Sequence, residues 1–202
     1  MIFIYGSGAR SKLIIKLIRE LKIKKKIILI DKKPKNKKKI FSEEYLIKKF
    51  NYGKDDLVLG FSNPKDKKET YERLINKKKF NLIKPLISKA ATIKKKSNIG
   101  KGTIIMDDAY LSENVKIGEN CFIGIDTLIS HDSKFDNFVE ISHKVKIAGN
   151  VKINECSFVG MGSIIIQNKK IKKNCFIGAG VLLKKNLGEN SKITLKQNLK
   201  SK

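Results

Sequence analysis

Large aliphatic residues recur at every sixth position through the second half of the chain. In the register that starts at Ile87, all seventeen positions are large and apolar, and they are Ile87, Ile93, Ile99, Ile105, Leu111, Ile117, Ile123, Ile129, Phe135, Ile141, Ile147, Ile153, Val159, Ile165, Ile171, Ile177 and Leu183. A second register lies two residues earlier. From Ser97 to Val181 it is small or β-branched at fourteen of its fifteen positions, with Lys169 as the exception.

A period of six excludes an α-helix, whose faces recur every 3.6 residues. It fits a strand that turns a corner every six residues, so that three flat faces make one coil of eighteen residues. The large aliphatic side chain then fills the interior, the small one leaves room, and a glycine after the large residue, as at Gly100 and Gly118, eases the corner. The pattern predicts a parallel β-solenoid over residues 85–187, of about five and two-thirds coils, followed by a tail over 188–202.

The first 84 residues alternate between short apolar runs and amphipathic segments. We predict strands over 2–5, 27–30, 57–61 and 80–83, helices over 11–21 and near 67–76, and a lysine-rich loop over 32–39. Strands that are apolar throughout and alternate with helices indicate a parallel sheet covered by helices. Residues 1–84 are therefore predicted to form a small Rossmann-like α/β domain.

A glycine-containing turn joins the first predicted strand to the first predicted helix. Gly6-Ser7-Gly8, followed by Arg10, resembles a dinucleotide-binding fingerprint that lacks its third glycine. The helix N-terminus after such a turn can receive a phosphate group. Asp31 ends the second predicted strand, where it either binds a ribose or base or serves as a turn residue.

The charge of the chain is strongly positive, with a formal net charge of +26. Nearly all the basic residues are Lys, since Arg10, Arg19 and Arg73 are the only arginines, and the chain has no Trp. Nucleic-acid readers rely on Arg and on interleaved aromatic side chains. We therefore expect a solvated lysine-rich surface rather than a nucleic-acid-binding protein, and this surface would favour encounter with anionic substrates.

The cysteines and the lengths of the apolar runs indicate the cellular compartment in which the protein is expected. Cys121, Cys156 and Cys175 are too far apart for a C-x-x-C motif, and their odd number argues against a disulfide framework. The apolar runs are far shorter than a membrane span, and the N-terminus has no basic region typical of a signal peptide. We expect a cytoplasmic protein with reduced thiols and without membrane insertion.

The hexads resemble those of the hexapeptide-repeat acyltransferases. The resemblance is strongest at His131-Asp132 and at Ala148-Gly149-Asn150, and it extends from the Gly6-Ser7-Gly8 turn to Gly178-Ala179-Gly180. Within this family, the chain is similar to bacterial sugar acetyltransferases that carry a small N-terminal α/β domain, of the nucleotide-aminosugar N-acetyltransferase and sialic acid O-acetyltransferase types. The resemblance implies a left-handed β-helix, a homotrimer, acetyl-CoA as cosubstrate between subunits, and a role in bacterial surface glycan biosynthesis.

The resemblance also assigns roles in catalysis. His131 matches the general base of the family, and Asp132 matches its acidic partner. Gly149 matches a glycine whose N–H faces the thioester carbonyl, although a plain corner glycine fits the sequence equally well. Glu140 stands where some relatives have a second functional histidine.

Binding roles follow in the same way. Gly162, Ala179 and Gly180 correspond to backbone groups that contact the pantetheine arm of CoA. In the N-terminal domain, the family binds the nucleotide of the sugar acceptor, which implies substrate contacts from Gly6, Ser7, Gly8, Arg10 and Asp31. Arg10 would suit a diphosphate. His143 is a further candidate for the wall of the acceptor site.

The favoured function is transfer of an acetyl group from acetyl-CoA to the amino group of a nucleotide-linked sugar. O-acetylation of a sugar or sialic acid hydroxyl is the close alternative, and Gly124, where aminosugar-acting relatives commonly have Asn, weakens the first reading slightly. A non-catalytic scaffold or polyanion binder would have no affinity for CoA. A γ-class carbonic anhydrase needs three metal-binding histidines, and the chain has only two, so we predict no metal site.

Overall fold

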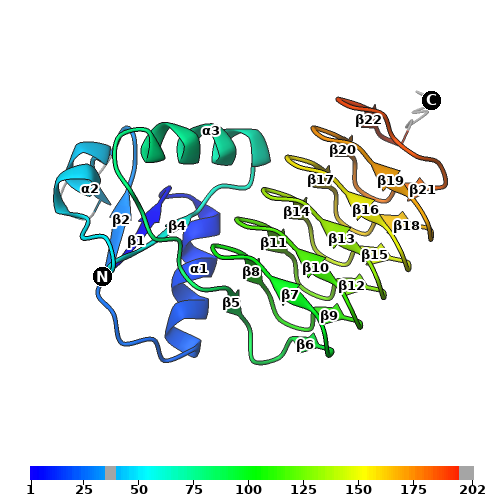
Figure 1. Ribbon diagram of the computed structural model, residues 1–202, viewed down its shortest axis with the longest axis horizontal. Helices are drawn as coiled ribbons and strands as arrows, with labels where there is room; N and C mark the ends of the chain where they lie inside the picture. The colour runs from blue at the N-terminus through cyan, green and yellow to red at the C-terminus, as the bar shows by residue number, and fades with distance from the viewer. Residues whose placement is uncertain (35–39, 196–202) are drawn as a thin grey trace, which may run out of the picture.

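The computed structural model describes residues 1–34 and 40–195. It shows an α/β domain beside a long three-sided solenoid (Figure 1). The fold class predicted from the hexads and from the strand–helix alternation is confirmed. Residues 35–39 of the predicted loop lie outside the described residues.

The α/β domain contains one parallel sheet with strand order β3-β2-β1-β4. Helix α1 packs on one face of the sheet, and α2 and α3 pack on the other. Strand β3 and helix α2 were not predicted from the sequence. The elements are β1 (Ile2–Tyr5), α1 (Ala9–Glu20), β2 (Ile27–Ile30), β3 (Ile40–Phe41), α2 (Glu43–Lys49), β4 (Asp56–Leu59) and α3 (Pro64–Ile75).

The strand predicted over 80–83 is wrong. The segment makes a single parallel bridge, between Leu82 and Leu57 at the edge of the sheet. The carbonyl of Ile83 accepts a hydrogen bond from the N–H of Gly102 in the first coil, at 2.7 Å. Pro85 stands two residues after Ile83, and it has no N–H to donate to a sheet hydrogen bond. The segment therefore leaves the sheet and enters the solenoid instead of forming a strand.

The solenoid consists of eighteen strands of two residues each, in three parallel sheets. Residues eighteen apart pair in register, as Ile123 does with Ile105 and Ile141. The strands are β5 (Leu86–Ile87), β6 (Thr92–Ile93), β7 (Asn98–Ile99), β8 (Ile104–Ile105), β9 (Tyr110–Leu111), β10 (Lys116–Ile117), β11 (Phe122–Ile123), β12 (Leu128–Ile129), β13 (Lys134–Phe135), β14 (Glu140–Ile141), β15 (Lys146–Ile147), β16 (Lys152–Ile153), β17 (Phe158–Val159), β18 (Ile164–Ile165), β19 (Lys170–Ile171), β20 (Phe176–Ile177), β21 (Leu182–Leu183) and β22 (Lys192–Ile193).

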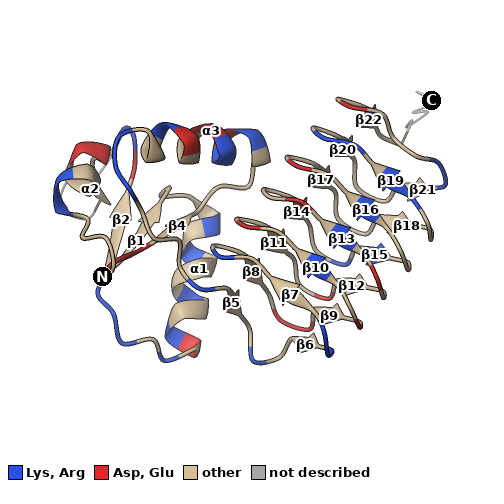
Figure 2. Cartoon of the chain, in the orientation of Figure 1, with Lys and Arg blue, Asp and Glu red and all other residues tan. Residues whose placement is uncertain are grey.

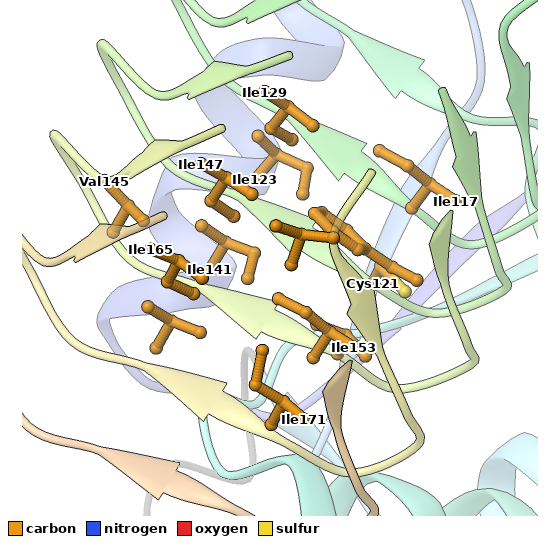
Figure 3. Packing of buried hydrophobic residues seen from close by; sticks show 14 of the residues in the cluster. Ile117, Cys121, Ile123, Ile129, Ile141, Val145, Ile147, Ile153, Ile165 and Ile171 are labelled. Atoms are coloured by element: carbon orange, nitrogen blue, oxygen red, sulfur yellow. The ribbon is translucent and has the colours of Figure 1, made fainter. Parts of the chain in front are cut away.

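The predicted aliphatic register forms the core of the solenoid. Each of its seventeen members is the second residue of a strand from β5 to β21, and these side chains stack along the interior (Figure 3). Inward serines and threonines are satisfied between coils. Thr103, for example, donates to the carbonyl of Gly118 at 2.7 Å and accepts from the N–H of Cys121 at 3.0 Å. The core thus buries hydroxyl groups without leaving their hydrogen bonds unmade.

The corners of the solenoid depend on residues that tolerate a positive φ, a feature that was not predicted from the sequence. From Lys96 to Gly180, every sixth residue has a φ of +53° to +71°. Eleven of these fifteen residues are Asn, Asp or Gly, which tolerate the left-handed conformation best. Two exceptions, Phe138 and Cys156, pack against the α/β domain.

The glycines that follow the large residues have a different role from the one predicted. Gly100 and Gly118 do not adopt positive φ. A Cβ on Gly100 would instead lie 2.5 Å from the backbone of Gly118 in the next coil, and a Cβ on Gly118 would lie 2.7 Å from the backbone N of Asn137. These glycines allow close approach of successive coils and do not ease the turn itself.

Each sheet of the solenoid presents a distinct outer surface, made by the first residue of each strand. The domain face is the seven-stranded sheet β5-β8-β11-β14-β17-β20-β22, which the α/β domain covers over its first coils. The apolar face is the six-stranded sheet from β6 to β21, whose outer residues are Thr92, Tyr110, Leu128, Lys146, Ile164 and Leu182. The lysine face is the five-stranded sheet from β7 to β19, where Lys116, Lys134, Lys152 and Lys170 align (Figure 2).

The two parts of the chain share a buried interface. Helix α1 packs with Leu86, Ile104 and Phe122 of the domain face. At the next edge, the ring of Tyr71 on α3 lies 5.8 Å from that of Phe138. These contacts fix the α/β domain against the solenoid.

The last described segment extends the solenoid. Strand β22 pairs in parallel with β20, so residues 188–195 of the predicted tail include a strand of the domain face. Residues 196–202 of that tail lie outside the described residues.

The described part of the chain has no helix of the length and apolarity needed to cross a bilayer. The three cysteines are free and buried, and burial raises the pKa of the Cys121 thiol to about 12.

Candidate functional site

His131 and Asp132 form a pair at the edge between the apolar face and the lysine face. They follow β12, and Nδ1 of His131 lies 2.8 Å from Oδ2 of Asp132. Both side chains are accessible, at 65% and 49% exposure. The carboxylate occupies Nδ1, which leaves Nε2 as the ring atom available to accept a proton from a ligand.

Two neighbouring coils hold this pair. In the preceding coil, Asn114 donates from Nδ2 to Oδ1 of Asp132 at 2.6 Å. The hydrogen bonds from His131, and after it from Asn114, lower the pKa of the Asp132 carboxyl. In the following coil, Gly149 lies under the imidazole, and a Cβ there would be 2.7 Å from Nε2 and Cε1 of His131. Gly149 therefore makes room for the ring.

The adjacent edge, between the domain face and the apolar face, carries the second histidine. Nδ1 of His143 accepts from the N–H of Ile125 at 2.9 Å, so the proton of the neutral ring lies on Nε2. Its ring meets that of Phe122 edge-on, with centroids 6.0 Å apart. Burial, and after it the charge of Arg10, lower the pKa of His143. The side chain is thus a neutral donor at neutral pH.

The predicted CoA-contacting residues lie on this same edge. Gly162 stands one coil beyond His143 and donates its N–H to the carbonyl of His143 at 3.0 Å. Gly180 stands one coil further on, beside the exposed Ala179. The structure therefore brings Gly162, Ala179 and Gly180 together with His143, and places His131 and Gly149 on the other side of the apolar face.

A cavity of about 530 Å³ opens at the carboxyl ends of the strands of the α/β domain. Strand β1 lies between β2 and β4, so this is a point where the strand order reverses, which is where open α/β sheets bind ligands. The predicted residues Gly6, Ser7, Gly8 and Asp31 line it. Gly6 has a φ of +112°, which favours glycine, and the hydroxyl of Ser7 donates to the carboxylate of Asp31.

Arg10 also lines this cavity, but its guanidinium is engaged with the solenoid. Nη2 lies 2.5 Å from Oε1 of Glu140, and Cζ lies 3.3 Å from the centre of the Phe122 ring. Glu140 is 1% exposed and also contacts Nζ of Lys67 at 3.1 Å. Glu140 is therefore the anion of a buried interface cluster.

A second cavity of about 710 Å³ continues from the first and was not predicted from the sequence. This interdomain groove shares Arg10, Ser62 and Asn63 with the first cavity. Its solenoid wall includes Phe158 and Phe176, whose rings stack 5.1 Å apart. The available signal was two aromatic residues eighteen positions apart on the outer side of a strand.

Within one chain, the two cavities and the His131–Asp132 pair lie on different sides of the solenoid. The α/β domain lies against the first coils of the domain face (Figure 1). His131 follows β12, between the apolar face and the lysine face, so it lies on the edge opposite the domain face. His143, in contrast, lies on an edge that borders the domain face and is close to Arg10 and Phe122. Ser142, next to His143, lines the interdomain groove, whereas none of the residues that line the two cavities lies on the edge that carries His131.

Comparison with known proteins agrees with this architecture. Residues 96–124 match the family model of the bacterial transferase hexapeptide (six repeats). The acetyltransferase domain of PglB from Neisseria gonorrhoeae, solved in complex with acetyl coenzyme A, is 20% identical with a TM-score of 0.85, over 95% of this chain and 94% of that one. WeeI from Acinetobacter baumannii is 20% identical with a TM-score of 0.84, over 95% of each chain.

A third similar structure is a variant of GDP-perosamine N-acetyl transferase from Caulobacter crescentus in complex with CoA and GDP-perosamine. It is 17% identical with a TM-score of 0.85, over 95% of this chain and 91% of that one. The chain thus carries the bacterial transferase hexapeptide repeat and has the two-part fold of the hexapeptide-repeat sugar acetyltransferases that it resembles.

Proposed function

We propose that this protein transfers the acetyl group of acetyl-CoA to the amino group of a nucleotide-linked sugar. The observation that carries the proposal is the exposed His131–Asp132 pair on a hexapeptide solenoid whose α/β domain has a cavity at its strand ends. The similar structures contain acetyl coenzyme A in one case, and CoA with GDP-perosamine in another. Cytoplasmic action and a part in bacterial surface glycan biosynthesis belong to this proposal.

The chemistry assigned to His131 is general base catalysis. Nε2 removes a proton from the amine as its nitrogen attacks the thioester carbonyl, and the Asp132 carboxylate stabilises the resulting imidazolium. The C–N bond forms, the C–S bond breaks, and the imidazolium returns the proton to the CoA thiolate. The N–H of Gly149 makes no hydrogen bond within the described part of the chain, and we assign it to the oxyanion.

The acceptor is assigned to the two connected cavities. The nucleotide occupies the cavity at Gly6, Ser7, Gly8 and Asp31, with its phosphates at the N-terminus of α1. Its sugar extends toward the interdomain groove and the Nε2–H of His143. A direct contact between Arg10 and the diphosphate would have to replace the ion pair with Glu140, so we assign the phosphates to backbone N–H groups first.

The proposal requires a second copy of the chain, because the acceptor cavities and His131 of one chain are apart. We propose a homotrimer in which the apolar face contacts a neighbouring copy and brings its His131 edge to the acceptor and to Gly162, Ala179 and Gly180. Leu128, Ile164 and Leu182 are 37%, 47% and 48% exposed and stand in one row on this face, with Lys146 between the first two. Burial of such a row in an interface would remove an exposed apolar patch.

The experiment combines binding and turnover. Acetyl-CoA should raise the melting temperature of the wild type and of His131→Asn alike, since the base does not bind the cofactor. A panel of UDP-, GDP- and dTDP-linked amino sugars, read by mass spectrometry, should show an acetyl adduct with the wild type, and the variant should form it about 10²- to 10⁴-fold more slowly. An adduct on amine-free sugars would favour O-acetylation, and the absence of any effect of acetyl-CoA would refute the proposal.

A further inference from the structure

The corner residue one coil before Asp132 has no role in the function proposed above. Asn114 stands eighteen residues before Asp132, and both have positive φ, at +58° and +61°. In this corner column, successive side chains lie one coil apart, about 4.8 Å along the solenoid. Asn114 is half-buried. Because it lies directly one coil before Asp132, its side-chain amide reaches the Asp132 carboxylate.

The contacts of Asp132 divide between its two oxygens. Oδ2 faces Nδ1 of His131 at 2.8 Å, and Oδ1 accepts from Nδ2 of Asn114 at 2.6 Å. A carboxylate held at one oxygen alone can rotate about its χ2 torsion, which is broad for Asp. The amide of Asn114 removes this freedom and directs Oδ2 at the imidazole.

The same column offers an internal comparison. Two coils further on, Asn150 donates from Nδ2 to Oδ1 of Asn168 at 2.9 Å. That pair has the same corner geometry, with φ of +56° and +60°. The backbone N–H of Asn150 donates to the carbonyl of His131 at 2.9 Å, but the two side-chain amides make no hydrogen bond to the side chains of His131 and Asp132 in the described part of the chain. The column therefore contains one amide that acts on the acid and one amide pair that serves the solenoid alone.

We propose that Asn114 is a positioning residue for the His131 base. It acts through Asp132: its amide fixes the carboxylate, and the carboxylate holds the imidazole with the proton on Nδ1 and the lone pair on Nε2. The three groups come from two successive coils, so the solenoid register itself aligns the relay. This inference rests on the proposed function for its kinetic consequence, but its structural part concerns the unliganded protein.

The test uses Asn114→Gly, which keeps a residue that tolerates positive φ and removes only the amide. Asn168→Gly is the matched control, three coils further along the same corner column. Long-range ¹⁵N NMR of the full-length protein reports the imidazole tautomers, and His131→Asn assigns the signals of the two histidines. In Asn114→Gly, the fraction of His131 with its proton on Nδ1 should fall, and the Asp132 carboxyl should titrate at higher pH than in the wild type. Neither quantity should change in Asn168→Gly.

Turnover supplies the second measurement. For Asn114→Gly we expect kcat to fall about three- to tenfold with KM unchanged, the size expected for one lost hydrogen bond. Asn114→Asp, which sets a second carboxylate against Asp132, should be at least as impaired. A tautomer fraction and kcat of Asn114→Gly equal to those of Asn168→Gly would overturn the inference. Full activity of His131→Asn would instead overturn the proposed function, and the tautomer measurement would still decide the role of Asn114.

Discussion

The buried charge cluster between the two parts of the chain leads to a sharp prediction on stability. Glu140 contacts both Arg10 and Lys67, and it is the single anion that does so among the residues that the structure describes. The side chains of Glu140, Lys67 and Arg10 are 1%, 3% and 13% exposed, so the cluster is largely removed from water. The substitution Glu140→Gln keeps the size of the side chain and leaves the two cations without a counter-charge.

The expected loss is that of a broken buried ion pair. Removal of one partner costs about 3–5 kcal/mol, because the remaining charge stays desolvated. Lys67 keeps one hydrogen bond, to the carbonyl of Asn120 at 3.2 Å, so the lower end of this range applies. At about 2–4 °C per kcal/mol for a chain of this size, the melting temperature should fall by roughly 6–12 °C.

The assay is thermal unfolding by circular dichroism, with hydrogen exchange of α1 and α3 as a local measure of the interface. Adding Lys67→Met to Glu140→Gln should recover part of the loss, since it removes one of the unpaired charges. Asp126→Asn is the control, because Asp126 pairs with Lys146 at 3.0 Å on the surface, where a pair contributes about 0–1 kcal/mol. If Glu140→Gln melts within the change caused by Asp126→Asn, the interface cluster is not the source of stability that we describe.

Three further predictions concern single positions. Gly149→Ala should displace the imidazole of His131, because the new Cβ would lie 2.7 Å from Nε2. Turnover should fall about tenfold or more while the melting temperature stays unchanged. Turnover equal to that of the wild type would contradict the close contact between Gly149 and the His131 ring. Gly118→Ala should lower the melting temperature, since its Cβ would lie 2.7 Å from the backbone N of Asn137. Gly162→Asn should leave the melting temperature unchanged, since the φ of +67° suits Asn and no atom lies within 4 Å of the added Cβ. Burial raises the pKa of Glu43, but hydrogen bonds from Arg73, Tyr5 and Lys77 outweigh it and lower the pKa to about 2. This carboxylate therefore stabilises the fold above its unfolded pKa of about 4.3, and the contribution is lost as pH falls toward 2. The free energy of unfolding of Glu43→Gln, measured by urea titration, should vary less than that of the wild type between pH 4.5 and pH 2.

The solenoid was predictable because its signal is repeated many times. One residue in six carries the same burial requirement, so the register from Ile87 to Leu183 fixes both the sheets and the core. The corner conformation has a similarly regular signal, because most residues at every sixth position from Lys96 to Gly180 are Asn, Asp or Gly, but it was not predicted. Short elements outside the repeat carry too few residues for a recognisable pattern, so β3, with two residues, and α2, with seven, were not predicted.

The candidate site was predictable only in part, for a similar reason. The contact between His131 and Asp132 is local, so adjacent residues suffice to suggest it. The engagement of Arg10 with Glu140 joins residues 130 positions apart, and no periodicity in the chain relates them. The two edges that carry His131 and His143 follow from counting faces, since twelve residues advance the chain by two faces of the prism.

In the three-sided coil, the number of residues that precede a position decides which edge of the prism its side chain lies on. An insertion of six residues between the α/β domain and His131 would turn the histidine by one face and move it to the edge that packs against α3. An insertion of eighteen would keep its orientation and displace it about 4.8 Å along the axis. Length variants ahead of His131 should therefore keep the stacked core and the orientation of the histidine only where they differ by whole turns of eighteen residues.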